Sequence, residues 1–113
     1  MSILIVDDDE GIRESMSDIL REKGFIVFKA SNGLEALNLV ESYTFDTILV
    51  DLRMPGLDGI ETSKQIKKIQ PDANIFMITA YISKEIYDDA KNAGIQEILS
   101  KPVNFQQLEK ILA

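Results

Sequence analysis

The chain has 113 residues, the length of one compact domain, and 45% of them are hydrophobic, enough to bury a core without disulfides or a structural metal. It contains no Cys and no His, which excludes thiolate and imidazole chemistry and the zinc sites built on those ligands. With 12 basic and 19 acidic residues the net charge is −7, the wrong sign for tracking a nucleic-acid backbone. Catalysis must therefore rest on carboxylates, hydroxyls, amines or a hard metal ion.

Five short apolar runs predict β-strands. Each run is nearly continuous and does not alternate with polar residues, which is typical of strands covered on both faces, as in a parallel sheet. The runs lie at residues 3–6, 25–28, 47–50, 75–78 and 98–99.

Apolar residues at helical spacing predict five α-helices after these runs. Asn32 and Asp58 are suited to cap the second and third helices, Gly24 and Gly94 to stop the first and fourth, and Asn104 begins a capping-box-like start for the fifth. Strict alternation of strands and helices predicts an α/β fold with a doubly wound parallel sheet. The predicted core-facing residues are Ile12, Met16, Ile19 and Leu20; Leu34, Leu37 and Val40; Ile60, Ile66 and Ile69; Ile86, Ala90 and Ala93; and Leu108, Ile111 and Leu112.

We expect residues 1–113 to form one domain. The first residues lack the basic segment of a secretory signal, and no apolar run approaches the length of a membrane span, so we expect a cytoplasmic protein without a membrane partner. The last helical pattern is still running at Ala113, so the chain is either a complete small protein or part of a longer one that carries an output domain.

Polar residues follow the predicted strands at the edge where open α/β sheets bind ligands. Two carboxylates about 4 Å apart repel by roughly 4 kcal/mol at an effective dielectric constant of 20, so such a cluster needs protons, cations or water. Oxygen ligands alone favour Mg²⁺, which also binds phosphate oxygens. The pattern predicts phosphate chemistry with Asp51, central in the set, as nucleophile. The residues of this set are Asp7, Asp8 and Asp9, then Asp51, Thr79 and Lys101.

Each of these residues also has an ordinary structural explanation. A lone acid is about as often a turn or cap residue as a functional one, and we assign Asp9 and Glu10 as first-turn acids that favour the helix dipole. Thr79 alone fits a strand-end hydroxyl, and Lys101 alone fits a solvent-facing side chain. Their coincidence at four strand ends is what favours a functional site.

Four segments resemble, in order and over essentially the whole chain, the signature motifs of response regulator receiver domains of two-component signalling: IVDDDE at 5–10, LVDLRMPGLDG at 49–59, ITA at 78–80 and Lys101-Pro102. The resemblance implies a flavodoxin-like sheet of strand order 2-1-3-4-5 with five helices. It also implies a phosphorelay function, in which the domain accepts a phosphoryl group and signals by conformational switching. The Lys101–Pro102 peptide resembles the family's cis bond.

By this resemblance Asp51 would be the phosphoacceptor, Lys101 would pair with it and then with the phosphoryl oxygens, and Thr79 would bond the phosphate. The donor would be a sensor histidine kinase or a histidine phosphotransfer protein. The chain would be no enzyme in the usual sense, because it would catalyse only its own phosphorylation and dephosphorylation.

The resemblance also implies a Mg²⁺ site. Asp8 and Asp51 would ligate the ion directly, Asp7 chiefly through water, and the backbone carbonyl of Arg53 would complete the protein ligands. The turn at 54–56 would shape the loop beside this site.

One position departs from the family pattern. Ile98 stands where many members have a Tyr or Phe that swings inward, so the resemblance does not carry the usual aromatic switch over to this chain, and Ile98 is either core or partner-facing. Tyr81 is an alternative residue to respond to the site or shield it. Arg53 and Tyr81 also occupy positions that tune phosphoryl loss in the family.

The expected docking surface for the donor comprises Ile12, Ser15 and Met16 with the Pro102-Val103 loop; the alternative is that these residues are core or ordinary surface.

A haloacid-dehalogenase-type phosphatase shares the Asp-x-Asp motif but needs an acidic pair after the Lys, where this chain has residues 102–105, PVNF. A nucleotide-binding module would need a glycine-rich phosphate loop, which is absent from the sequence. A purely structural interaction domain is disfavoured by the full acid set.

Overall fold

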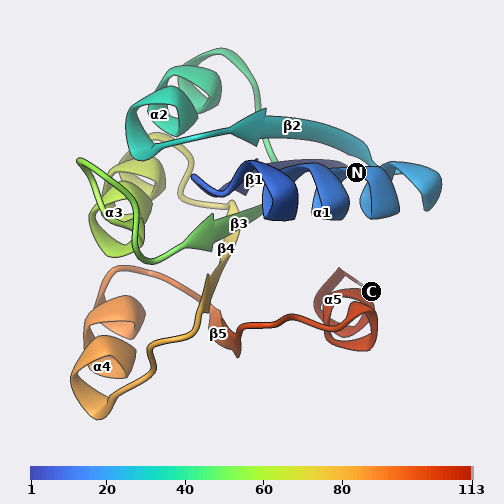
Figure 1. The fold of residues 1–113 in the computed structure, drawn as a ribbon. Helices are drawn as coiled ribbons and strands as arrows, with labels where there is room; N and C mark the ends of the chain where they lie inside the picture. Colours follow the sequence, from blue (N-terminus) through green and yellow to red (C-terminus); the bar gives the residue numbers. More distant parts are fainter. Residues whose placement is uncertain (113) are drawn as a thin grey trace.

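A five-stranded parallel sheet with helices on both faces forms the protein, as seen in a computed structural model that describes residues 1–112 (Figure 1). The strand order is β2-β1-β3-β4-β5, which confirms the predicted fold class and strand order. Ala113, the last residue of the predicted domain, lies outside the described residues. The elements are β1 (Ser2–Val6), α1 (Glu10–Glu22), β2 (Ile26–Ala30), α2 (Gly33–Ser42), β3 (Thr47–Asp51), α3 (Gly59–Ile69), β4 (Asn74–Thr79), α4 (Lys84–Asn92), β5 (Glu97–Ser100) and α5 (Phe105–Leu112).

The sheet separates two hydrophobic cores. Helices α2, α3 and α4 cover one face, and α1 and α5 cover the other (Figure 1). Along each central strand, successive side chains point to opposite faces, so Leu4 and Val6 join the first core while Ile3 and Ile5 join the second. Both faces are apolar, which explains why the strand sequences are continuous apolar runs.

The second strand begins one residue later and ends two residues later than predicted. Phe25 belongs to the turn after α1, where its N–H donates to the Leu20 carbonyl at 3.2 Å. The strand continues through Lys29 and Ala30, because β2 pairs with β1 from Ser2 opposite Ile26 to Val6 opposite Ala30. Pairing with a neighbour, and not local hydrophobicity, sets its length.

The predicted helix faces are partly wrong, because three of the large apolar residues are exposed: Ile19 (39%), Leu34 (65%) and Ile69 (42%). The buried residues of α2 are Gly33, Ala36 and Val40, and Gly33 packs against α3. A Cβ on Gly33 would lie 2.3 Å from Thr62 Oγ1, so this approach of α2 to α3 requires glycine. The stripe predicted for α2 is therefore correct at Leu37 and Val40, which pack in the core, and wrong at Leu34.

The predicted caps are confirmed at helix starts. The carboxylate of Asp58 and the amide oxygen of Asn32 each accept a hydrogen bond from the backbone three residues later. Asp9, predicted as a first-turn acid, is instead the N-cap of α1 and accepts from Ile12 N. Asn104 accepts from Gln107 N at 2.8 Å, as the predicted capping-box start requires. The Lys101–Pro102 peptide is cis, as expected. In the part of the chain that is described, no helix combines the length and apolar character needed to cross a bilayer.

Candidate phosphoacceptor and cation site

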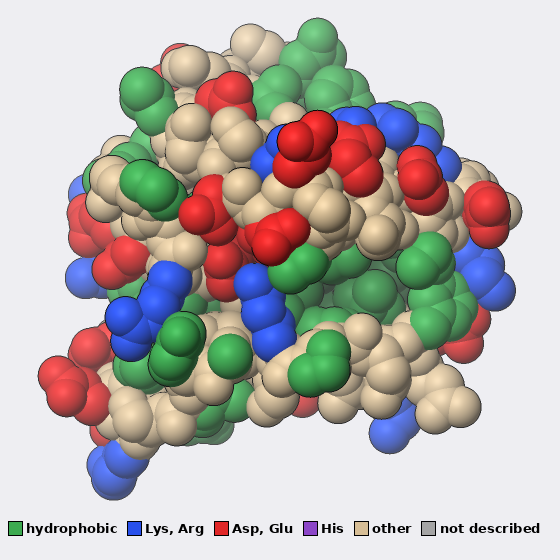
Figure 2. All heavy atoms as spheres, viewed as in Figure 1, with side chains coloured by type: hydrophobic (Ala, Val, Ile, Leu, Met, Phe, Trp, Pro, Cys, Tyr) green, Lys and Arg blue, Asp and Glu red, His purple; other side chains and the backbone are tan. Residues whose placement is uncertain are grey.

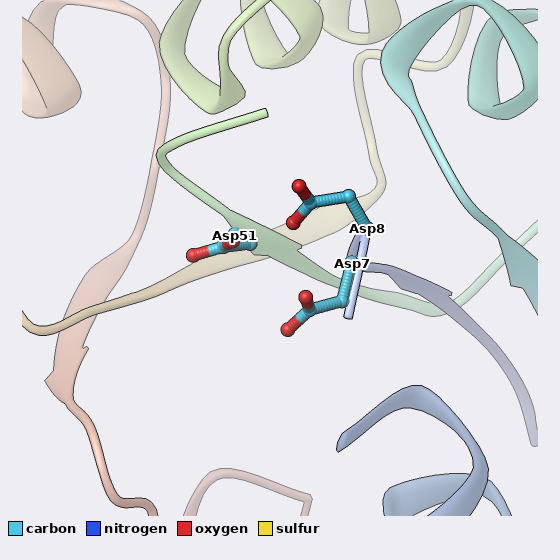
Figure 3. Close-up of side chains that lie close together, drawn as sticks. All are labelled: Asp7, Asp8 and Asp51. Carbon is cyan, nitrogen blue, oxygen red and sulfur yellow. The ribbon is translucent and has the colours of Figure 1, made fainter. Parts of the chain in front are cut away.

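Three carboxylates converge at the carboxyl edge of the sheet, from two neighbouring strands. Asp7 and Asp8 follow β1, and Asp51 is the last residue of β3. One oxygen of each lies within 4.8 Å of the others, and Figure 3 shows the three side chains directed into a common space. Asp7 and Asp51 are only 4% and 7% exposed, whereas Asp8 is open to solvent. Hydrophobic strands thus hold two acids in a poorly solvated position.

Lys101 bridges the two buried acids. Its Nζ lies 3.2 Å from Asp51 Oδ1 and 3.4 Å from Asp7 Oδ2. Its backbone N–H donates to the Thr79 carbonyl at 3.0 Å, which ties the end of β5 to β4 and directs the residue at the cluster. One ammonium faces three carboxylates, so the group carries excess negative charge.

The protonation equilibria reflect this crowding. Burial, reinforced by the negative charge of Asp7, raises the pKa of Asp51 above its usual value, although Lys101 opposes the shift. Burial by itself would lower the pKa of Lys101, but the charges of Asp7 and Asp51 outweigh it and raise that pKa. A carboxylate of raised pKa beside a firmly charged ammonium is the expected result of placing more acids than bases in a dry pocket.

Thr79 ends β4 beside the cluster. It lies one residue beyond Ile78, the β4 partner of Asp51, and its side chain is 1% exposed. The Oγ1 atom accepts a hydrogen bond from the Tyr81 N–H at 3.0 Å, which leaves the hydroxyl proton available to a ligand.

The β3–α3 loop returns closely over Asp51. A Cβ on Gly59 would lie 2.3 Å from the Asp51 carbonyl oxygen, so only glycine allows this approach. The Gly59 N–H donates to the Leu52 carbonyl at 2.7 Å, which closes the loop. Asp58 caps α3 through Glu61 N at 2.8 Å, so this acid serves the helix.

Asp9 stays outside the cluster, as predicted. Its carboxylate accepts from Ile12 N at 3.0 Å and caps α1. The Asp-x-Asp pair that a phosphatase would use is therefore divided, with Asp7 in the site and Asp9 at a helix start. Asp7, Asp8, Asp51, Thr79 and Lys101 are the predicted residues that gather at this edge.

Ile98, at the position of the family's aromatic switch, and Tyr81, the alternative to it, lie in different environments. Ile98, opposite Met77 on β4, is partly buried and packs against the core under α2, α3 and α4. Tyr81 is 55% exposed, and its ring stacks on the Arg53 guanidinium, with Cζ 4.1 Å from the ring centroid. The Arg53–Tyr81 pair therefore forms a surface feature between the loops after β3 and β4.

Sequence reasoning missed Arg13. Its Nη1 donates to the backbone carbonyl of Asp7 at 2.8 Å. A basic residue six positions after an acid carries no recognisable signal, because only the conformation of the β1–α1 turn brings the two together.

An apolar groove of about 670 Å³ adjoins Lys101 between α1 and the β5–α5 loop. Figure 2 shows a hollow lined by hydrophobic side chains beside the acidic and basic side chains near the middle of the view. Its lining includes every residue of the expected docking surface: Ile12, Ser15, Met16, Pro102 and Val103. Docking itself stays a prediction.

Comparisons with known proteins agree with this geometry. Residues 3–113 match the profile of the family described as "Response regulator receiver domain". Sporulation initiation phosphotransferase F of Bacillus subtilis is 35% identical over 94% of this chain and 86% of its own length. A cyclic di-GMP phosphodiesterase of Thermotoga maritima is 41% identical over 96% of this chain, but the chain spans only 29% of that protein.

Solved structures show the same fold. The chemotaxis protein CheY4 of Vibrio cholerae superimposes with a TM-score of 0.93 at 34% identity, over 98% of this chain and 94% of that one. The receiver domain of a sensor histidine kinase from Pseudomonas aeruginosa superimposes with a TM-score of 0.88 at 28% identity, over 98% and 93%. That structure has a magnesium ion coordinated in its active-site cleft.

Proposed function

This chain belongs to the response regulator receiver domain family of two-component signalling, and on that premise we propose that its Asp51 accepts a phosphoryl group from a phosphohistidine in a Mg²⁺-dependent reaction. One observation carries the proposal: Asp51 is buried, 3.2 Å from the Lys101 ammonium, and shares a cluster with two further carboxylates. A poorly solvated carboxylate can act as a nucleophile toward phosphorus, and the Lys101 ammonium beside it can stabilise the negative charge of the phosphoryl group.

The donor set fits Mg²⁺. The oxygens of Asp7, Asp8 and Asp51 are hard ligands, and their uncompensated charge favours a divalent cation. Asp8 and Asp51 would hold the ion directly, Asp7 through water, and the Arg53 carbonyl would add a neutral ligand. When bound, Mg²⁺ neutralises charge on the acids and on the transferring phosphoryl group. The magnesium in the Pseudomonas receiver supports this assignment.

Asp51 acts as the nucleophile. A carboxylate oxygen forms a bond to phosphorus while the bond from phosphorus to the donor imidazole nitrogen breaks, and the electron pair stays on that nitrogen. Asp51 must be ionised to attack; burial raises its pKa in the metal-free protein, and both Lys101 and a bound cation would favour the ionised form. Lys101 keeps its proton and pairs with the phosphoryl oxygens, while the Thr79 hydroxyl donates to them.

Phosphorylation also supplies the signal. It replaces the single negative charge of the Asp51 carboxylate with a phosphoryl group that carries about 1.5 to 2 negative charges, so Lys101 and Thr79 must reorganise around it. Both residues sit at the ends of β5 and β4, and their movement would bias a two-state equilibrium of these strands and α4.

The family exchanges phosphoryl groups with histidine kinases or phosphotransfer proteins, and we propose that one of these docks in the groove between α1 and the β5–α5 loop. The groove is apolar and ends at Lys101, so a helix lying in it would place a histidine near Asp51. We propose no hydrolase activity for this chain, which would catalyse only its own phosphorylation and dephosphorylation. The output activity of a longer protein, and a cytoplasmic location, stay predictions.

Incubation with Mg²⁺ and acetyl phosphate, followed by intact mass measurement, tests the proposal. Wild type should gain one phosphoryl group, and Asp51→Asn should gain none. Asp58→Asn is the matched control, because asparagine also caps helices well and Asp58 lies outside the carboxylate cluster. Steady hydrolysis of varied phosphate esters would favour a phosphatase, and unchanged mass without Mg²⁺ binding would favour a structural module.

A further inference from the structure

The peptide group between Asp7 and Asp8 lies where β1 leaves the sheet. The pairing of β1 with β2 and β3 ends at Val6, so the Asp7 carbonyl lies beyond the strand ladder. The Arg13 guanidinium, on the second turn of α1, donates to this carbonyl at 2.8 Å. A carbonyl left without a donor in such a poorly solvated place is unfavourable, so the bond holds this peptide in one orientation.

The two acids joined by this peptide are held very differently. Asp7 is fixed by its N–H to the Ala30 carbonyl at 3.1 Å, by the Asp9 N–H to its Oδ1 at 2.9 Å, and by Lys101 at 3.4 Å. Asp8 is exposed, and Lys101 contacts Asp7 and Asp51 instead. Within residues 1–112 no group donates a hydrogen bond to the Asp8 carboxylate. Because a peptide unit is planar, the Asp7 carbonyl direction also sets where the Asp8 side chain begins.

We propose that Arg13 is a positioning residue of the cation site, which orients the Asp7–Asp8 peptide so that the Asp8 carboxylate faces Asp7 and Asp51. The inference rests on the proposed function, since it concerns the same Mg²⁺ site. Hydrogen bonds from neighbouring residues to the ligands of a metal site orient those ligands and commonly change the affinity of the site for the metal. Here the Arg13 bond acts on the peptide group that joins two of the ligands, Asp7 and Asp8.

Charge and position predict opposite effects for the loss of Arg13. A guanidinium close to a cation site repels the cation, so by charge alone its removal would strengthen Mg²⁺ binding. If Arg13 orients Asp8, its removal weakens binding, because the carboxylate then samples directions that do not face the cluster. The sign of the change therefore separates the two roles.

The test is a Mg²⁺ titration followed by backbone amide NMR, on wild type and on Arg13→Met, which keeps the apolar stem and removes the donor. The expected result is a Mg²⁺ Kd about 10-fold higher in Arg13→Met. Arg21→Met is the matched control. Arg21, also on α1, donates from Nη2 to the Val27 carbonyl at 3.0 Å, the same kind of bond away from the cluster. Its loss should leave the Kd within about 2-fold of wild type.

Circular dichroism shows whether each variant is folded. Arg13→Lys, which keeps the charge and a donor without the guanidinium geometry, should have an intermediate Kd and serves if Arg13→Met fails to fold. A Kd that is unchanged or lower without Arg13 overturns the inference, as does an equal rise in Arg21→Met. If wild type is phosphorylated and binds Mg²⁺, and Arg13→Met binds Mg²⁺ equally well, this inference alone is overturned. If wild type binds no Mg²⁺, the proposed function is overturned as well.

Discussion

Replacing Asp51 with asparagine removes one buried charge and changes little in shape. At an effective dielectric constant of 20, Lys101 at 3.2 Å attracts the Asp51 carboxylate by about 5 kcal/mol. Asp7, with oxygens within 4.8 Å, repels it by about 3.5 kcal/mol, and the exposed Asp8 by roughly half of that. These attractive and repulsive energies nearly cancel. The desolvation of Asp51 therefore determines whether its charge stabilises the folded protein, and desolvation disfavours the charged form.

In the absence of Mg²⁺, Asp51→Asn should therefore be more stable than wild type at neutral pH, by about 1 kcal/mol. For a chain of this length that corresponds to a rise in melting temperature of about 4 °C. The raised pKa of Asp51 in the folded protein fixes the pH dependence, because protonation of this residue favours the folded state. Its contribution to the free energy of unfolding is greatest below pH 3.8, the ordinary pKa, and is lost as the pH rises through the pKa of the folded state. The advantage of Asp51→Asn should thus shrink as the pH falls.

Thermal unfolding in EDTA over a pH series measures this difference. Asp18→Asn, an exposed acid on α1, is the control and should stay within about 0.5 kcal/mol of wild type. Saturating Mg²⁺ should stabilise wild type more than Asp51→Asn, because it binds the folded state of the protein that has the complete acid set. An Asp51→Asn variant that is less stable than wild type in EDTA at neutral pH would refute the reasoning that burial outweighs the Lys101 contact.

Three further substitutions test other parts of the structure. Gly59→Ala should destabilise the fold by about 2 kcal/mol or more in urea unfolding and slow phosphorylation, because its Cβ would lie 2.3 Å from the Asp51 carbonyl; unchanged stability would contradict the loop packing. Ser17→Ala should be neutral or stabilising by about 1 kcal/mol, since the buried Oγ has no hydrogen-bond partner within residues 1–112, and a clear loss of melting temperature would contradict this. Lys101 has a raised pKa in the folded protein, so its charge stabilises the fold below pH 10.5, and this stabilisation is lost as the pH rises through the folded-state pKa. Lys101→Met should not show this loss of stability at alkaline pH; identical profiles of stability against pH in the two proteins would count against the ion pairs.

The fold was predictable because its signals are local and repeated. Continuous apolar strands and capped helices in strict alternation leave few topologies, and the carboxyl ends of parallel strands meet at one edge. That rule is why Asp7 and Asp8, Asp51 and Lys101, which come from three separate parts of the chain, could be placed together from the sequence alone. The strand order came from the family resemblance.

Other features depend on contacts that have no sequence period. The buried face of α2 uses Gly33 where Leu34 looked favourable, since the distance between α2 and α3 decides which side chain fits. Phe45, 2% exposed, lies outside every strand and helix but packs edge-on against Phe28 with ring centroids 5.3 Å apart. The Arg13 bond to Asp7 depends on a turn conformation that the sequence does not specify.

The location of the phosphoryl group tests the central claim most directly. Borohydride reduces an aspartyl phosphate to homoserine, so reduction of the phosphorylated protein, digestion and peptide mass spectrometry identify the modified residue. We predict homoserine at position 51 alone, in the wild type with Mg²⁺ and in no sample lacking Mg²⁺. Homoserine at Asp7 or Asp8, or a phosphoryl group on a hydroxyl such as Thr79, would contradict the assignment of Asp51 as the phosphoacceptor.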